Sequence, residues 1–219
     1  HTAIRRQRQM CIRDSHEYRP LYQKDIPIRK KTLSIQWNHQ FTLPNNGISE
    51  LLETNYFLDY QGVRFIALNS NVMIDEQMEW LETVLKNNPH KWTIAFFHHP
   101  LYSATTKRDY PERRKRWKPL FDKYGVDLAL QGHDHTYARG SESLYEKNLL
   151  TGTNIKDATG TVYVVSVSGP KQYDIKPSWD QYEATRHKAG ANKQLFQVIS
   201  IDGNKPVSYT HLTLPTNSG

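Results

Sequence analysis

The chain has a single cysteine, Cys11, and no long apolar run in its 219 residues. One thiol can form neither an internal disulfide nor a metal site built from several thiolates, so both kinds of cysteine-stabilised scaffold are excluded. No apolar run approaches the roughly 20 residues that a membrane-spanning helix needs, and we therefore expect no membrane span. Internal repeats and low-complexity stretches are also absent, which leaves a globular segment long enough for one domain.

The two ends of the chain differ from the rest. The leader HTAIRRQRQMCIRDS resembles the translation of a common sequencing adapter, and the tail VSYTHLTLPT resembles the translation of its reverse complement. Such segments are excluded from fold reasoning. We therefore expect residues 1–15 and 206–219 to be non-native and residues 16–205 to be the native segment. The alternative is a natural basic arm that binds nucleic acid or directs targeting, and the match of both ends to one adapter disfavours it.

Part of the net positive charge of the chain lies in that leader. Since the leader holds four arginines and one aspartate, leaving it out lowers the formal net charge from +7 to +4. An excess of this size does not favour a nucleic-acid partner, and we expect none.

Two apolar runs end abruptly in histidines. The first, Ile94 to Pro100, reads IAFFHHP, and the second, Leu128 to His135, reads LALQGHDH. Each run is typical of a buried strand whose histidines lie in the loop past its carboxyl end, the edge at which open α/β sheets bind ligands. Several imidazoles at one edge favour a site for zinc, iron or a similar ion. A lone histidine is more simply a polar loop or core residue, but two strand ends make the metal site the better interpretation.

Four further segments are predicted as strands. They are rich in β-formers or alternate between apolar and polar residues, and they cover residues 55–60, 63–68, 161–168 and 194–201. Gln61 and Gly62, between the first two, predict a hairpin turn. In the second histidine run, Gly132 is expected to let the backbone turn sharply.

Two helices are predicted between the strands. The first covers residues 75–88, with Asp75 as its N-cap, and the second covers residues 111–124. Pro119 should kink or split the second helix. The basic run 113–116 is interpreted as a solvated face. Alternation of helices with apolar strands predicts an α/β fold.

The histidine motifs resemble those of a known family. The strings F-x-H-H-P-L-Y and G-H-D-H-T-Y-A-R are similar to the last two motifs of the calcineurin-like metallophosphoesterases, and their extensions resemble the purple acid phosphatase branch. The similarity runs from about His16 to Ile201. It implies an α/β fold, the second half of a four-layer αββα sandwich, with residues 16–205 as a partial metallophosphoesterase catalytic domain. The family's two earlier motifs, D-x-H and G-D, do not occur in this segment.

The resemblance assigns roles to four histidines. His98, His133 and His135 match metal ligands, with His98 and His133 on one ion and His135 on the other. His16 matches the catalytic histidine of the G-N-H-[DE] motif, although residues of the adapter-like leader occupy the positions of its Gly and Asn. The implied cofactors are two divalent or mixed-valence ions of iron, zinc or manganese.

Four neighbouring residues complete the predicted site. His99 follows a ligand directly, and successive side chains diverge, so we expect it beside the ligands or at the rim. Asp134 is expected to orient an imidazole, because metal-bound histidines usually donate their other N–H to a carboxylate or carbonyl. Lys107 and Arg108 either contact a phosphate oxygen of the substrate or form a solvated charge pair, and the sequence favours neither.

The resemblance implies a hydrolase of phosphate monoesters that uses a dinuclear metal centre and a bridging hydroxide. Its substrate would be a phosphorylated small molecule or protein, and the parent protein would be exported to the periplasm or secreted. One alternative is a phosphodiesterase or nucleotidase on the same fold, and another is a non-catalytic metal-binding or interaction domain. Without the earlier motifs, we expect the isolated chain to bind at most one ion weakly and to be inactive.

Overall fold

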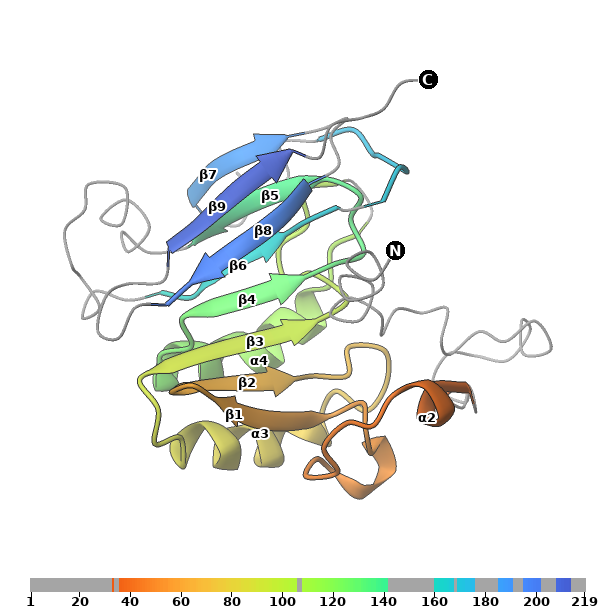
Figure 1. Ribbon diagram of the computed structural model, residues 1–219, viewed down its shortest axis with the longest axis vertical. Helices are drawn as coiled ribbons and strands as arrows, with labels where there is room; N and C mark the ends of the chain where they lie inside the picture. The colour runs from red at the N-terminus through yellow and green to blue at the C-terminus, as the bar shows by residue number, and fades with distance from the viewer. Residues whose placement is uncertain are drawn as a thin grey trace.

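A seven-stranded mixed sheet in the order β1-β2-β3-β4-β6-β5-β7 forms the centre of the computed structural model (Figure 1). The structure describes residues 33, 36–105, 108–141, 160–167, 169–175, 185–190, 195–201 and 208–213. The helices of this part are α2 (Gln36–Gln40), the short 3-10 helix η3 (Ser49–Leu51), α3 (Gln77–Lys86) and α4 (Pro111–Tyr124). The strands are β1 (Tyr56–Tyr60), β2 (Val63–Ala67), β3 (Trp92–Phe97), β4 (Leu128–Gln131), β5 (Tyr137–Ser141), β6 (Val162–Val165), β7 (Thr185–Gly190), β8 (Leu195–Ser200) and β9 (Ser208–Thr213).

The predicted hairpin is confirmed. β1 and β2 pair antiparallel from Tyr56 opposite Ala67 to Tyr60 opposite Val63. Gln61 and Gly62 both have positive φ, 48° and 78°, as a tight turn between twisted strands requires. The hairpin delivers β2 into the sheet as the neighbour of β3.

Parallel pairing then brings four strand ends to one edge. β2 pairs parallel with β3, β3 with β4, and β4 with β6. The carboxyl ends of these strands therefore lie along the same edge of the sheet, where the loops after β2, β3 and β4 meet. This edge is the place where an open α/β sheet binds ligands.

The two long helices cover one face of the sheet and form its main core. Phe97 of β3 packs edge-on against Trp117 of α4, with ring centroids 5.0 Å apart. Trp117 and Phe121 are fully buried, as is Leu81 of α3. Each such side chain contributes about 1.5–3 kcal/mol when it leaves water. The apolar faces of both helices therefore lie in the core.

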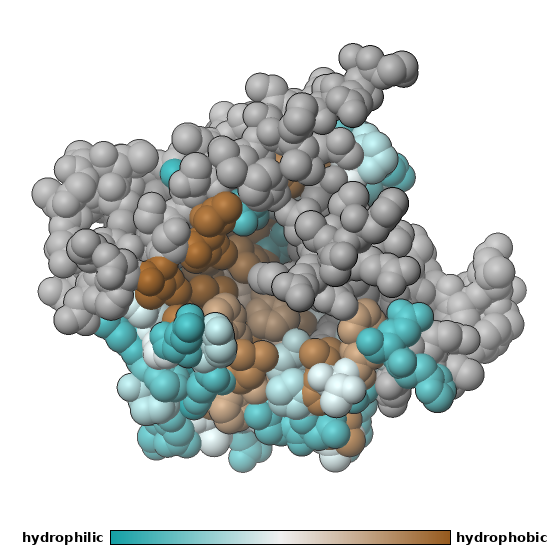
Figure 2. Space-filling model, viewed as in Figure 1, coloured by the Kyte–Doolittle hydropathy of each residue, from teal (hydrophilic) through white to brown (hydrophobic). Residues whose placement is uncertain are grey.

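The opposite face of the sheet carries a second apolar cluster. It joins Ile94, Leu128 and Val164 of the central strands to Leu195 of β8. Figure 2, in the same view as Figure 1, shows hydrophobic side chains gathered in the middle of the visible face above a more hydrophilic lower edge. Apolar clusters on both faces are typical of a sheet covered on two sides, and the predicted α/β fold is confirmed.

Two details of the helices differ from prediction. α3 begins at Gln77 after Glu76, without a side-chain cap, because Asp75 instead forms an ion pair with Arg116 of α4. α4 runs unbroken past Pro119. Pro119 and Lys115, the residue one turn earlier, are both exposed, so water can satisfy the carbonyl that a proline leaves without its amide partner.

Of the two predicted adapter segments, only part of the tail lies within the described residues. The leader and His16 lie outside the described residues. In the tail, β9 pairs antiparallel with β8, with Leu195 opposite Thr213. The pairing does not test where the tail comes from, and its adapter origin stays a prediction. In the described ranges, no helix combines the length and apolar character that crossing a bilayer requires.

Candidate metal centre

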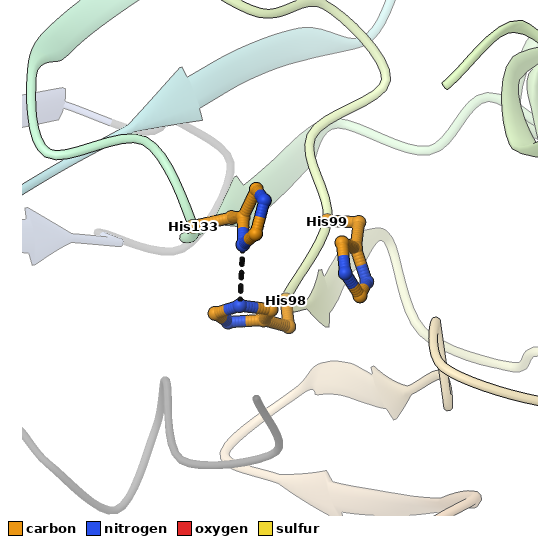
Figure 3. Close-up of side chains that lie close together, drawn as sticks. All are labelled: His98, His99 and His133. Carbon is orange, nitrogen blue, oxygen red and sulfur yellow. Dashed lines mark hydrogen bonds between the residues drawn. The ribbon is translucent and has the colours of Figure 1, made fainter. Parts of the chain in front are cut away.

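Three imidazoles meet at the carboxyl edge of the sheet. His98 and His99 follow β3, and His133 follows β4, one residue beyond Gly132. The Nε2 atom of His98 lies 2.9 Å from the Nδ1 atom of His133 (Figure 3). One ligand atom from each of the three rings lies within 4.8 Å of the others. His98 and His99 are buried and His133 is partly buried.

The turn after β4 aims His133 at this cluster. The Gly132 amide donates to the His98 carbonyl at 2.9 Å, and the Asp134 amide donates to the Gly132 carbonyl at 2.8 Å. The sharp turn predicted at Gly132 is present, but its positive φ of 68° falls on His133. A non-glycine residue in that conformation stores strain that persists only where its surroundings fix it, as they do at many functional sites.

Tyr110 contacts the other side of His133. Its Oη atom lies 2.8 Å from the Nε2 atom of His133, while its ring packs edge-on against His99 with centroids 4.7 Å apart. Burial raises the pKa of Tyr110 above its ordinary value, so the phenol keeps its proton at neutral pH. Both nitrogens of His133 are therefore engaged, one toward His98 and one toward Tyr110.

Arg113 of α4 contacts Ser70 and Tyr110, two residues that themselves contact the imidazoles. Its Nε donates to the Ser70 carbonyl at 2.7 Å, and its guanidinium lies 4.4 Å from the centre of the Tyr110 ring. The expectation that residues 113–116 form only a solvated face is wrong for Arg113 and also for Arg114, which donates to the Leu101 carbonyl at 2.6 Å. The loops after β2 and β3 lie against the first turn of α4 and accept these bonds.

His99 lies inside the cluster. Successive side chains diverge only within a strand, and the chain leaves β3 before His98. The rings of His98 and His99 can therefore approach each other, and their centroids lie only 4.9 Å apart. Burial, and secondarily the Arg113 guanidinium, lowers the pKa of His99 far below its ordinary value. The ring is therefore neutral at physiological pH.

Asp134 does not orient an imidazole, contrary to the sequence prediction. Its carboxylate accepts hydrogen bonds from the Ser103 hydroxyl at 2.6 Å, the Ala104 amide at 3.1 Å and the Thr105 hydroxyl at 3.1 Å. Burial raises its pKa to about 6, although these donors act in the opposite direction. Asp134 instead fixes the loop after β3 to the loop after β4, because its carboxylate accepts from three successive residues of the loop after β3.

His135 lies outside the three-histidine cluster within the described part of the chain. Its Nδ1 atom lies 3.0 Å from the Lys171 carbonyl, and its ring packs against Tyr173 with centroids 4.6 Å apart. The role of His135 as a ligand of another ion stays a prediction. His16 and Lys107 lie outside the described residues.

Arg108 connects the three-histidine cluster to Tyr173, the ring against which His135 packs. It donates to the His133 carbonyl at 2.6 Å and to the Tyr173 hydroxyl at 3.2 Å, and its guanidinium lies 4.7 Å from the centre of the Tyr173 ring. Of the two alternatives for this residue, the solvated charge does not fit these contacts. The cation lies beside the imidazoles, where it can attract an anion.

The donor set fits a borderline transition metal. Imidazole nitrogens suit zinc, iron, copper and nickel, whereas magnesium and calcium prefer oxygen ligands. Facing nitrogens on His98 and His133 can converge on one ion. Four residues of this site were missed by sequence reasoning: Ser70, Tyr110, Arg113 and Tyr173. Only Ser70 carried a signal, since it too follows a predicted strand.

The sequence and the fold of this chain are similar to those of known proteins. The sequence profile of the calcineurin-like phosphoesterases matches residues 7–137. Purple acid phosphatase 15 of Arabidopsis thaliana is 27% identical over 168 residues, which cover 73% of this chain and 29% of that protein. Human acid phosphatase type 7 is 27% identical over 154 residues, covering 61% of this chain and 33% of the relative.

A solved structure has a similar fold. The purple acid phosphatase PPD1 from yellow lupin seeds superimposes with a TM-score of 0.56 at 22% sequence identity, over 77% of this chain and 32% of the lupin chain. At this identity the likeness concerns the fold. The chain spans about a third of the length of the proteins that it matches.

Proposed function

Because the chain belongs to the calcineurin-like phosphoesterase family, we propose that it carries part of the metal centre of a hydrolase of phosphate monoesters. The observation that carries this proposal is the approach of His98 Nε2 to His133 Nδ1, 2.9 Å apart at two neighbouring strand ends. Acid phosphatases among the relatives support a phosphate ester as substrate, on a small molecule or a protein. Export of the protein to the periplasm or outside the cell is part of the same proposal.

We propose a centre of two ions, each iron, zinc or manganese. His98 and His133 would hold one ion, and His135 would contribute to the other. When bound, such a pair polarises the phosphoryl oxygens and makes water nucleophilic at neutral pH. His16 is proposed as the group that protonates the leaving oxygen.

The surrounding residues suit a phosphate-bearing substrate. Arg108 and Arg113 place two guanidinium groups against residues that touch the imidazole cluster. Positive charge beside a partly buried site raises the local concentration of an anion and stabilises charge that develops on its oxygens. Neutral Tyr110 adds a polar group between them without adding negative charge.

The test measures phosphate release from an aryl phosphate by the full-length gene product. The protein is stripped with a chelator and then reconstituted separately with zinc, iron and manganese. We expect activity to disappear on chelation and to return with metal. His98→Ala and His133→Ala should each abolish it and lower metal affinity by more than the roughly 10–100-fold that loss of an outer partner costs.

His90→Ala is the matched control, because His90 lies before β3 and contacts Asp59 at 3.2 Å. It should keep both metal and activity. A bis-aryl phosphate diester is assayed in parallel. Release from the diester alone would assign a phosphodiesterase, and bound metal without release from either ester would assign a non-catalytic metal-binding domain.

A further inference from the structure

Ser70 lies in the loop after β2, and its hydroxyl holds the loop after β3. Its Oγ atom lies 3.2 Å from the His98 amide and 2.9 Å from the His99 amide, and both amides donate to it. The same oxygen lies 3.0 Å from the Nδ1 atom of His99. In the part of the chain that the structure describes, these three nitrogens are the partners of the Ser70 hydroxyl.

This arrangement determines which nitrogen of His99 carries the proton. A hydroxyl has one hydrogen and two lone pairs, and the two amides of the loop occupy both lone pairs of Ser70. The hydroxyl hydrogen is then left for the Nδ1 atom of His99, which must accept it and is therefore unprotonated. A neutral imidazole carries its single hydrogen on the other nitrogen, so the hydrogen-bond network assigns His99 as the Nε2–H tautomer.

We propose that His99 is a neutral hydrogen-bond donor that contacts a phosphoryl oxygen of the substrate through Nε2–H and that it is not a metal ligand. The proposal rests on the proposed function, since it names a substrate contact of that site. A metal-bound histidine normally donates its other N–H to an oxygen acceptor. Ser70 cannot be that acceptor, because its oxygen already receives two amide hydrogens and its own hydrogen would be left without a partner.

The position of the ring suits a donor. His99 packs against both His133 and Tyr110, with its ring centroid 4.7 Å from each of theirs. Only 7% of its surface is exposed, and no side chain or carbonyl of the described residues accepts a hydrogen bond from its Nε2. A fixed donor beside a metal site, held by a buried hydroxyl, is the kind of group that stabilises developing charge on a phosphoryl oxygen.

The tautomer can be observed directly. In full-length protein labelled with ¹⁵N-histidine and loaded with zinc, we expect His99 Nδ1 to have the chemical shift of an unprotonated nitrogen and Nε2 that of a protonated one. With ¹¹³Cd in place of zinc, ¹⁵N–¹¹³Cd coupling should appear at His98 and His133 and not at His99. Coupling at His99, or an Nδ1–H tautomer, overturns the proposal.

Substitutions give a second readout. His99→Ala should leave the dissociation constant for zinc within about threefold and lower kcat/KM for the aryl phosphate by roughly 100-fold or more, as removal of one oxyanion donor does. His99→Gln, which keeps a side-chain N–H, should retain more activity than His99→Ala. His90→Ala should change neither quantity.

The two proposals fail in different ways. Loss of zinc binding in His99→Ala to the same extent as in His98→Ala overturns the donor role alone. Absence of phosphate release by wild-type protein, with the metal bound and the Nε2–H tautomer intact, overturns the proposed function and with it any substrate contact of His99.

Discussion

Tyr110 Oη lies 2.8 Å from the Nε2 atom of His133, whose other nitrogen faces His98 Nε2 at 2.9 Å. The imidazole is thus held between a residue of the loop before α4 and the strand end of β3. A metal-binding histidine needs one nitrogen for the ion and an outer partner that fixes the ring. Tyr110 supplies that partner, and this relationship decides which nitrogen of His133 can bind metal.

Tyr110→Phe should therefore weaken metal binding. The ring contact with His99 is retained and only the hydroxyl is lost, so we expect zinc affinity to fall by about 10–100-fold, the usual effect of removing an outer partner. Competition with a chromogenic chelator measures it. Tyr124→Phe is the control, since it removes a hydroxyl that contacts Glu82 on the surface. Equal zinc affinity in Tyr110→Phe and wild type would show that Tyr110 does not fix His133.

Asp134→Asn should destabilise the fold. The carboxylate accepts three hydrogen bonds from residues 103–105, and an amide keeps only one acceptor oxygen. The amide then places an N–H where the carboxylate accepted a hydrogen bond, and we expect this mismatch in a buried network to cost about 1–3 kcal/mol in the free energy of unfolding. Urea denaturation of the metal-free protein measures the change. Asp122→Asn, an exposed partner of Lys118, should stay within about 0.5 kcal/mol of wild type.

The two long helices and six of the strands could be predicted from local pattern, whereas α2, β5, β7 and β9 were not predicted. The apolar runs before His98 and His133 each fit one buried strand, and parallel pairing of neighbouring strands then brings their ends together. The hairpin at Gln61 and Gly62 and the apolar faces of the helices also follow from spacing alone. These features depend on residues that are near one another in the chain.

The contacts around the histidines could not be predicted in this way. Tyr110 and Arg113 reach the site because α4 lies against the loop after β2, a packing that no spacing in the sequence encodes. Asp134 turned toward Ser103 because the positive φ of His133 reorients the residues that follow it. Nonlocal packing, and a single strained backbone position, decided these partners.

The side chain of Gln77 should be required to hold the loop that carries Ser70 in place. The side chain is fully buried, accepts from the Asn69 amide at 2.8 Å, and donates to the Asn69 carbonyl at 2.8 Å and the Met73 carbonyl at 2.9 Å. Gln77→Met keeps similar volume but removes the side-chain partner of the buried Asn69 amide and carbonyl and of the partly buried Met73 carbonyl. We expect a loss of about 2–3 kcal/mol in the free energy of unfolding and faster amide hydrogen exchange in residues 69–73.

The control for this substitution is Gln40→Met, at an exposed position of α2. It should leave both stability and exchange unchanged. Equal exchange rates for residues 69–73 in Gln77→Met and wild type would mean that the loop is held by its other contacts.

The ion pair between Asp59 and Arg64 should make the free energy of unfolding depend on pH in the acid range. Arg64 is buried, and its Nε and Nη2 donate to the two carboxylate oxygens of Asp59 at 2.8 and 2.7 Å. Its Nη1 donates to the Val84 carbonyl at 2.8 Å, which ties the hairpin to α3. Asp59→Asn leaves the guanidinium without its counter-charge, and we expect a loss of about 1–3 kcal/mol at pH 7, because Asp59 itself is partly exposed.

The sign of the pH effect follows from the same contacts. The hydrogen bonds from Arg64 hold the pKa of Asp59 below its ordinary value in the folded protein, whereas the unfolded chain has a value of about 3.9. Well above the unfolded value both states are ionised and the full contribution is present. As the pH falls below about 4, the unfolded state takes up the proton first, so the stabilisation is lost toward the folded pKa. Urea denaturation should therefore show a smaller difference between wild type and Asp59→Asn at pH 3 than at pH 7, while the exposed control Glu112→Gln should match wild type at pH 7. A difference that stays constant between the two pH values would show that the contribution of Asp59 does not depend on its charge.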